Sequence, residues 1–161
     1  MHCTITRQQV QRPNYFEEFS RFWSHREEVR KIWFSLFTPQ QGQEAEERLT
    51  PNDRLRIVNE LRWLRASFPK IGMSGVVLEG YLHPPASPQE CIFAQTTTCV
   101  SADLATHIEP CQFGGQPVCS ECGCIASAGL ASIGKYKLAG LIRVSQIFSV
   151  SRKVGEHFTG T

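Results

Sequence analysis

The run Ile32-Trp33-Phe34-Ser35-Leu36-Phe37 is almost continuously apolar and is followed by the turn-forming residues Thr38-Pro39-Gln40-Gln41-Gly42. A short apolar run that ends at a turn is typical of a strand buried on both faces, as strands of a parallel sheet are. A shorter β-branched segment, Cys3-Thr4-Ile5-Thr6, lies upstream and is expected to form another strand. These two segments set the fold class.

A helix is expected between the two strands. Pro13-Asn14 begins it, with Asn14 as the N-cap and Glu17 three residues later in capping-box spacing. Phe16, Phe19 and Trp23 then form one apolar stripe. Strand, helix and buried strand make a βαβ unit, which implies parallel neighbours.

A second helix is predicted after residue 50. Thr50 is its N-cap, Pro51 occupies the first helical position, and Asp53 stands at the third. Pro69 ends it. Its expected apolar face is Leu55, Val58, Leu61, Leu64 and Phe68. Val76-Val77-Leu78 is interpreted as a further strand, so the first part of the chain belongs to the α/β class.

Three segments are expected along the chain. Residues 1–82 form the α/β part, which ends at a Pro-rich linker, Pro84-Pro85-Ala86-Ser87-Pro88. Residues 83–128 form a cysteine-rich module, in which 95–101 and 106–108 are expected to pair as a β-hairpin before a helix over 125–138. Residues 129–161 hold the rest of that helix and a basic tail.

The cysteines carry the strongest chemical signal. Six of the seven lie between residues 91 and 124, and three of these fall in the compact run Cys119-Ser-Glu-Cys122-Gly-Cys124. Thiolates are soft ligands that suit zinc or an iron–sulfur cluster. The candidate ligands are Cys91, Cys111, Cys119, Cys122 and Cys124. Cys3 and Cys99 are interpreted as small buried apolar residues, and His83 and His107 do not stand at short ligand spacing from a cysteine.

Composition narrows the classes of partner. Residues 81–128 contain four acidic residues and no lysine or arginine, whereas a zinc module that binds nucleic acid needs cations for the phosphates. No run approaches the roughly 20 apolar residues of a membrane span, so no membrane partner is expected. The start Met1-His2-Cys3-Thr4 does not have the form of a signal peptide. We therefore expect a reducing, cytoplasmic compartment with free thiols.

The order of these segments resembles the C-terminal half of a radical S-adenosylmethionine protein. In that family the last strands of a partial (β/α)6 barrel precede a SPASM or twitch module with auxiliary iron–sulfur clusters. Cys91 before the hairpin, Cys111 at its end, and the turn Cys119 to Cys124 leading into a helix match the order of the module. The resemblance implies a partial (β/α) barrel remnant of βαβα order, followed by a small Cys-rich β-hairpin plus helix module.

The same resemblance implies cofactors and partners. An auxiliary [4Fe–4S] cluster would transfer electrons or anchor a substrate, often a peptide. Residues at the strand ends would line the S-adenosylmethionine cleft: Thr6, Arg7, Gln8, Ser35 and Leu36. The family's Cys-x3-Cys-x2-Cys motif is absent from this sequence, so the chain alone is expected to be inactive in S-adenosylmethionine cleavage. The lone parallel strand pair suggests that an N-terminal half is supplied elsewhere.

Two other readings use the same cysteines. Four of them could form a closed structural zinc site in a module that binds a partner and does no chemistry. The other alternative is a secreted domain held together by disulfides, which predicts few free thiols. Under the cluster hypothesis, the absence of lysine and arginine around the thiols is expected to favour the oxidised cluster.

Overall fold

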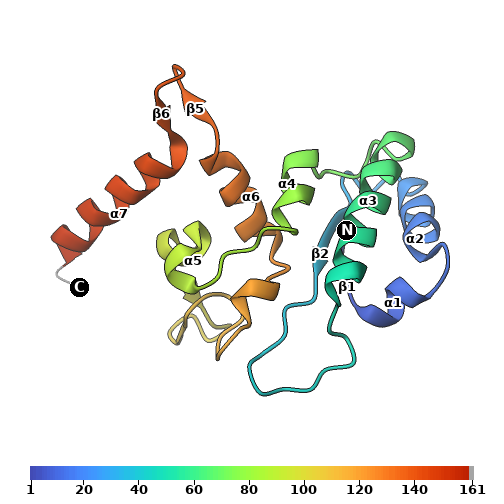
Figure 1. The fold of residues 1–161 in the computed structure, drawn as a ribbon, viewed down its shortest axis with the longest axis horizontal. Coiled ribbons are helices and arrows are strands. Elements are labelled where there is room, and N and C mark those ends of the chain that lie inside the picture. Colours follow the sequence, from blue (N-terminus) through green and yellow to red (C-terminus); the bar gives the residue numbers. More distant parts are fainter. Residues whose placement is uncertain (160–161) are drawn as a thin grey trace.

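The fold is that of a computed structural model, which describes residues 1–159 of the chain. Strands β1 (His2–Ile5) and β2 (Trp33–Leu36) pair in parallel, with His2 opposite Trp33 and Ile5 opposite Leu36. Helices α1 (Arg7–Gln11) and α2 (Tyr15–Ser24) connect them. The predicted βαβ unit is therefore confirmed, and the chain is of the mixed α/β class (Figure 1).

Strand β2 has partners along both of its edges. Its odd-numbered amides face β1: those of Trp33 and Phe37 donate to the carbonyl oxygens of Met1 and Ile5, both at 2.9 Å. Its even-numbered amides face the other edge, where Ile32 N–H donates to Lys70 O at 2.8 Å. A parallel bridge between Ile32 and Ile71 extends this second edge. The sheets in the described part of the chain are two-stranded, and no barrel closes.

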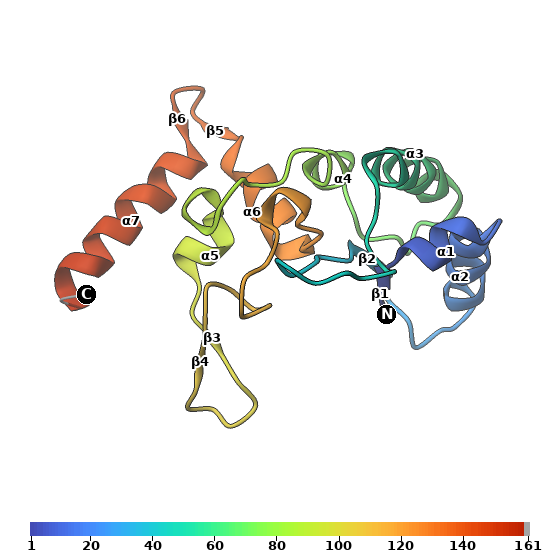
Figure 2. The same cartoon turned by 60° about the horizontal axis from the view of Figure 1, so that its bottom comes forward.

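One face of the β1–β2 pair carries the hydrophobic core. Cys3, Ile5, Phe34 and Leu36 point to this face and are at most 6% exposed. Helix α3 (Pro51–Ser67) and helix α4 (Gly75–Gly80) lie over the strand pair (Figure 2). Their buried residues include Ile57, Leu61, Leu64 and Leu78.

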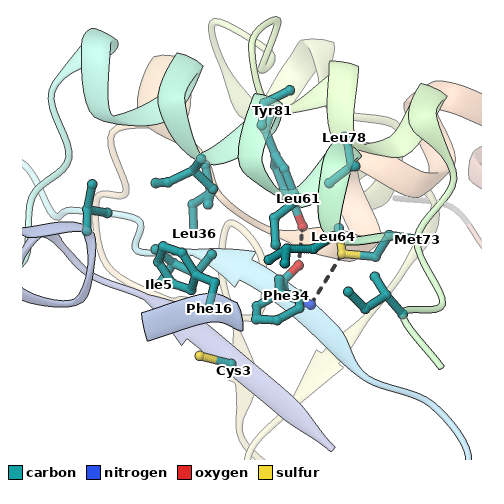
Figure 3. Packing of buried hydrophobic residues seen from close by; sticks show 14 of the residues in the cluster. Cys3, Ile5, Phe16, Phe34, Leu36, Leu61, Leu64, Met73, Leu78 and Tyr81 are labelled. Carbon is teal, nitrogen blue, oxygen red and sulfur yellow. Dashed lines mark hydrogen bonds between the residues drawn. The ribbon is translucent and has the colours of Figure 1, made fainter. Parts of the chain in front are cut away.

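Phe34 is fixed in this core by two polar contacts that Figure 3 shows. The buried Tyr81 hydroxyl donates to Phe34 O at 2.6 Å, and Phe34 N–H donates to the sulfur of Met73 at 3.3 Å. Since an unpaired buried main-chain group costs free energy, these contacts satisfy a strand edge that no neighbouring strand covers at this point.

The predictions for the first two helices differ in accuracy. Helix α2 forms as expected, but Asn14 adopts a left-handed conformation (φ 58°) and makes no side-chain cap. Short α1 was not predicted, because it has only one buried side chain, Val10, to reveal it. In α3 the predicted Thr50–Asp53 capping box is confirmed, with Asp53 N–H donating to Thr50 Oγ1 at 3.1 Å.

Two predictions in this part of the chain are wrong. Residues 76–78 lie in helix α4 and not in a strand, because Ser74 caps the helix by accepting from Val77 N–H at 3.3 Å. The buried face of α3 also differs from the predicted one: Leu55 is 49% exposed, whereas Arg54 is only 7% exposed. A leucine was expected to mark the buried face, and an arginine takes that place.

The cysteine-rich half consists of short elements. They are η1 (Pro88–Glu90), α5 (Ile92–Thr96), β3 (Cys99–Val100), β4 (His107–Ile108), η2 (Cys119–Glu121) and α6 (Ile125–Gly134). The predicted hairpin is present as the antiparallel pair β3–β4. It is shorter than expected because residues 95 and 96 belong to α5.

Residues 129–159 do not form the predicted end of a helix followed by a basic tail. Helix α6 ends at Gly134, and a hairpin of β5 (Lys137–Leu138) and β6 (Ile142–Arg143) leads into helix α7 (Val144–Thr159). Helix α7 lies at the end of the molecule opposite to α2 (Figure 1). No helix in residues 1–159 has the length and apolar character that a membrane span requires.

Candidate metal centre

Cys91 is the buried centre of the cysteine group. It follows η1, precedes the first turn of α5, and is 8% exposed. Its sulfur lies 3.2 Å from the hydroxyl oxygen of Ser127 on α6. Since α5 packs on α6, the site is built where these two helices meet.

The run from Cys119 to Cys124 reaches the same place from η2. Cys124 is the N-cap of α6, and its sulfur accepts hydrogen bonds from Ser127 N–H at 3.4 Å and from the Gln112 side-chain amide at 3.0 Å. The sulfur of Cys122 accepts from Cys124 N–H at 3.4 Å. Donors aimed at sulfur favour the thiolate form, which is the form that binds metal.

The pKa shifts of the thiols indicate which cysteines influence one another electrostatically. Burial raises the pKa of Cys111, Cys119 and Cys124, and in each case negative charge at Cys91 raises it further. Charge at Cys111 also raises the pKa of Cys119 and Cys124. Cys91 and Cys111 therefore act electrostatically on both other thiols, and Cys91 also acts on Cys111.

Cys122 lies at the edge of this group. Burial raises its pKa to about 11, with charge at Cys124 and Cys91 adding to the shift and a contact with the Thr38 hydroxyl opposing it. Its thiol thus faces the loop after β2 as well as the other cysteines.

The remaining candidates stand apart. Cys99 lies on β3, and its charge raises the pKa of Cys111. Burial alone raises the pKa of Cys3 to about 11, which fits a small core residue. His83 lies 3.3 Å from a carboxylate oxygen of Glu79, and His107 is exposed on β4. All seven cysteines are free thiols.

The described thiols do not form a closed site for a metal ion. In residues 1–159, no set of three or more cysteine, histidine, aspartate or glutamate side chains is close enough to hold one metal ion. A tetrahedral zinc site with Zn–S bonds of about 2.3 Å needs sulfurs roughly 3.8 Å apart. An iron–sulfur cluster places its ligand sulfurs farther apart, because inorganic sulfide and several irons lie between them.

Arg54 of α3 holds the backbone of the cysteine turn. Its Nη1 donates to Glu121 O at 2.8 Å and its Nη2 to Cys122 O at 2.6 Å, and the same guanidinium donates to Tyr81 O. Its hydrogen bonds thus end on main-chain carbonyls. Burial lowers the pKa of Arg54, and charge at Cys122 and Glu121 opposes that shift.

Positive charge therefore does reach the cysteine turn, contrary to the sequence-based expectation. Arg54 lies behind it, and Arg48 forms a two-point ion pair with Glu121, with Nε donating to Oε2 at 2.8 Å. Both arginines come from a distant part of the chain, so the count over residues 81–128 missed them. The premise that no lysine or arginine lies near the thiols is therefore wrong, while the redox preference of a cluster at this place stays a prediction.

The turn is docked on the end of β2. Leu36 N–H donates to Gly123 O at 2.9 Å, and Gly123 N–H donates to Thr38 Oγ1 at 2.9 Å. Farther along, Val118 N–H donates to Pro39 O at 2.8 Å. The cysteine-rich turn thus occupies the β2 edge where another strand would otherwise pair.

The five residues expected at a cofactor cleft divide between several places. Ser35 and Leu36 border a cavity of about 230 Å³ on the polar face of the sheet, together with Thr4 and Cys124. Arg7 borders a different, larger cavity. Thr6 N–H donates to the Gln9 side chain at 2.8 Å at the start of α1, and Gln8 is exposed. Neither Thr6 nor Gln8 borders these two cavities.

Sequence reasoning missed three polar residues of the site: Arg54, Gln112 and Ser127. The sequence does indicate the position of Arg54. It stands three and four residues before the buried Ile57 and Val58, which is the spacing of one helix face. No sequence pattern indicates Gln112 or Ser127, because their hydrogen bonds to sulfur depend on where the Cys124 side chain lies.

Comparisons of this chain with protein-family models, with curated proteins and with solved structures each return no match.

Proposed function

We propose that this chain binds a [4Fe–4S] cluster through thiolates of its cysteine-rich module, as an auxiliary cluster for electron transfer or substrate anchoring. The observation that carries the proposal is the position of Cys91, whose charge acts on Cys111, Cys119, Cys122 and Cys124 from other elements. Thiolates contributed by separate segments of the chain are a typical cluster donor set.

The electrostatic effects of the thiols on one another's pKa favour one set of four ligands. Cys91 and Cys111 each act on Cys119 and on Cys124, so we assign these four as the ligands. Cys122 is then the structural member of the turn, with its thiol toward Thr38 and its carbonyl on Arg54.

The rest of the site suits a cluster. Gln112 and Ser127 supply hydrogen bonds to the Cys124 sulfur, and burial of Cys91 and Cys124 limits the access of water. A bound cluster would supply one-electron transfer or an open iron position for a substrate atom. Hydrogen bonds to sulfur and nearby cations set the potential of such a cluster, and Arg54 is the nearest candidate cation.

The scaffold supports a kinship with the radical S-adenosylmethionine proteins. Helices cover one face of the parallel strand pair, while Thr4 and Ser35 on the other face share a 3.2 Å hydroxyl contact and border a cavity next to Cys124. Strands inside and helices outside is the layout of a (β/α) barrel segment. We propose that the chain is the C-terminal part of such a partial barrel and that the cavity is the remaining edge of the cofactor cleft.

The proposal includes a partner for radical chemistry. This sequence lacks the Cys-x3-Cys-x2-Cys ligands of the S-adenosylmethionine-cleaving cluster, so a separate polypeptide or segment would supply them. Among residues 1–159, β1 is paired only on its β2 side. Its other edge offers main-chain groups for a parallel strand of the partner.

Structural zinc is the second candidate, favoured by the N–H···S contact from Cys124 to Cys122 inside a tight Cys-x2-Cys-x-Cys turn. Zinc would draw four of the same thiols closer together and would add folding free energy without chemistry.

Anaerobic purification separates the two. We expect a brown protein whose iron and acid-labile sulfide are equimolar, with a native mass that exceeds the polypeptide by one cluster. A colourless protein with one zinc per chain would reject the cluster and establish the structural site. A protein that retains neither, after separate anaerobic treatment with iron plus sulfide and with zinc, would reject both.

A further inference from the structure

A second cavity near the cysteine turn is larger than the one next to Cys124. It has a volume of about 510 Å³ and lies between the start of α3, the residues after α4, and the outer side of η2. It shares no lining residue with the cavity on the polar face of the sheet. Its volume is within the range of small-molecule sites, about 300–1,000 Å³.

The charge lining this cavity is mostly positive. Arg7, Arg48 and Arg54 border it, against a single carboxylate from Glu121. Three separate segments of the chain contribute these charges: the first residue of α1, the loop before α3, and α3 itself. Their convergence is a property of the tertiary structure and not of a local basic run.

Two of the three arginines lack a carboxylate partner. None of the ion pairs among the described residues includes Arg7 or Arg54. Arg54 is 7% exposed, and its hydrogen bonds end on carbonyl oxygens. Buried charges are ordinarily paired, because transfer of an unpaired ion from water is costly. A cationic guanidinium beside a cavity is a place where an anion would be stabilised.

Most of the remaining lining is apolar, apart from Thr50 and Ser120. Leu49, Leu82 and Pro84 border the cavity with Ala45 and Pro51, and Tyr81 closes its buried side. A free inorganic ion would leave this surface without a partner, whereas an organic anion would cover it.

We propose that this cavity binds a small organic anion, a carboxylate or a phosphate ester with an apolar body. The anionic group would be held by Arg7 near the Arg54 charge, with Arg48 shared between the ligand and Glu121, and the apolar body would lie on Leu49, Leu82 and Pro84. Bidentate contacts of arginine with carboxylate or phosphate are strong and directional. Since Ser120 and Glu121 of η2 line the cavity, a bound ligand would touch the turn that carries Cys119 and Cys122.

Three probes of similar size test the proposal on the full chain: benzoate, phenyl phosphate and the neutral benzamide. Binding is measured by calorimetry and by amide chemical shifts. We expect at least one of the anions to bind with saturable shifts at Leu82, Ser120 and Glu121, and benzamide to bind at least about tenfold more weakly. The tighter of the two anions identifies the class as carboxylate or phosphate ester. Equal binding of benzamide and the anions, or binding of none of them, overturns the proposal.

Substitutions with opposite expected signs make the test specific. Arg7→Gln and Arg48→Gln should weaken binding of the anion about tenfold, whereas Glu121→Gln should strengthen it by removing the opposing charge. Arg12→Gln is the matched control, because Arg12 is an exposed arginine beside α1 that pairs with Glu18 and does not line the cavity. Equal effects of the Arg7 and Arg12 substitutions would contradict the assignment.

The anion proposal does not depend on the metal. A colourless protein that still binds benzoate or phenyl phosphate would reject the cluster and keep this site. A brown protein that binds neither benzoate nor phenyl phosphate would keep the cluster and reject the anion site.

Discussion

The main chain of Gly123 lies directly against that of Leu36. Leu36 N–H donates to Gly123 O at 2.9 Å, and a Cβ added at position 123 would stand 2.0 Å from Leu36 O. The contact joins the cysteine turn to the end of β2, and with it the cysteine-rich module to the α/β part. A side chain at this position has no room, since the obstacle is backbone.

Gly123→Ala should therefore separate the turn from the strand. We expect a loss of unfolding free energy of about 3 kcal/mol or more, because the backbone must shift and two hydrogen bonds break. Chemical denaturation checks this. Gly129→Ala is the control, since a Cβ at position 129 meets no atom within 4 Å. In a helix that change should stabilise by up to about 1 kcal/mol. Equal effects of the two substitutions would disprove the docking contact.

Arg54→Gln tests whether the Arg54 side chain holds the backbone of the cysteine turn in place. The substitution leaves carbonyl oxygens of Tyr81, Glu121 and Cys122 without their donors, and we expect a loss of about 2–4 kcal/mol in unfolding free energy. Arg54→Lys should retain part of the stability, because the charge remains but the fork geometry does not. The exposed neighbour Arg56→Gln serves as the control, and its unfolding midpoint should match that of the unchanged protein.

Single cysteine substitutions test the ligand assignment. Serine at Cys91, Cys111, Cys119 or Cys124 should each remove most of the iron and sulfide from anaerobically purified protein, because a serine hydroxyl is a poor ligand for iron. Serine at Cys122 should keep the metal content, as should serine at Cys3 or Cys99. Metal analysis and visible absorption measure the outcome. Loss of iron in Cys122→Ser, with retention in Cys119→Ser, would exchange the roles of these two residues.

The buried thiol of Cys3 predicts a pH dependence. Its pKa is raised from 9.0 to about 11 by burial, so the folded state holds the proton more tightly than the unfolded state does. The stabilisation is complete below pH 9 and is lost as the pH rises toward 11. It is on the order of 1–3 kcal/mol.

Denaturation of metal-free protein at several pH values measures this slope, and Cys3→Ala isolates it. The substitution lowers stability at every pH by removing a buried side chain, so the informative quantity is the change between pH 8 and 11. We expect a smaller decline in Cys3→Ala than in the unchanged protein. Parallel curves for the two proteins would show that Cys3 does not titrate in the folded state.

Periodicity predicted the parallel strand pair, the α2 and α3 helices and the β3–β4 hairpin, because each follows from local alternation, caps and turn residues. The same reasoning failed at residues 76–78, where a serine cap and the burial of Leu78 outweigh the strand preference of valine. It placed Leu55 in the core because it favoured apolar residues, whereas the carbonyls of a distant turn make Arg54 the buried residue of that face.

The sequence by itself determined the chemistry available to this protein: a dense set of thiols downstream of a short parallel α/β unit. Tertiary structure alone decided which thiols lie around Cys91, which arginines reach them, and where a positively charged cavity opens beside the turn. The physical reason is that local patterns report the burial of neighbours a few residues apart. Contacts such as those of Arg54 with Cys122 or of Leu36 with Gly123 join residues far apart in the sequence, and no local pattern encodes them.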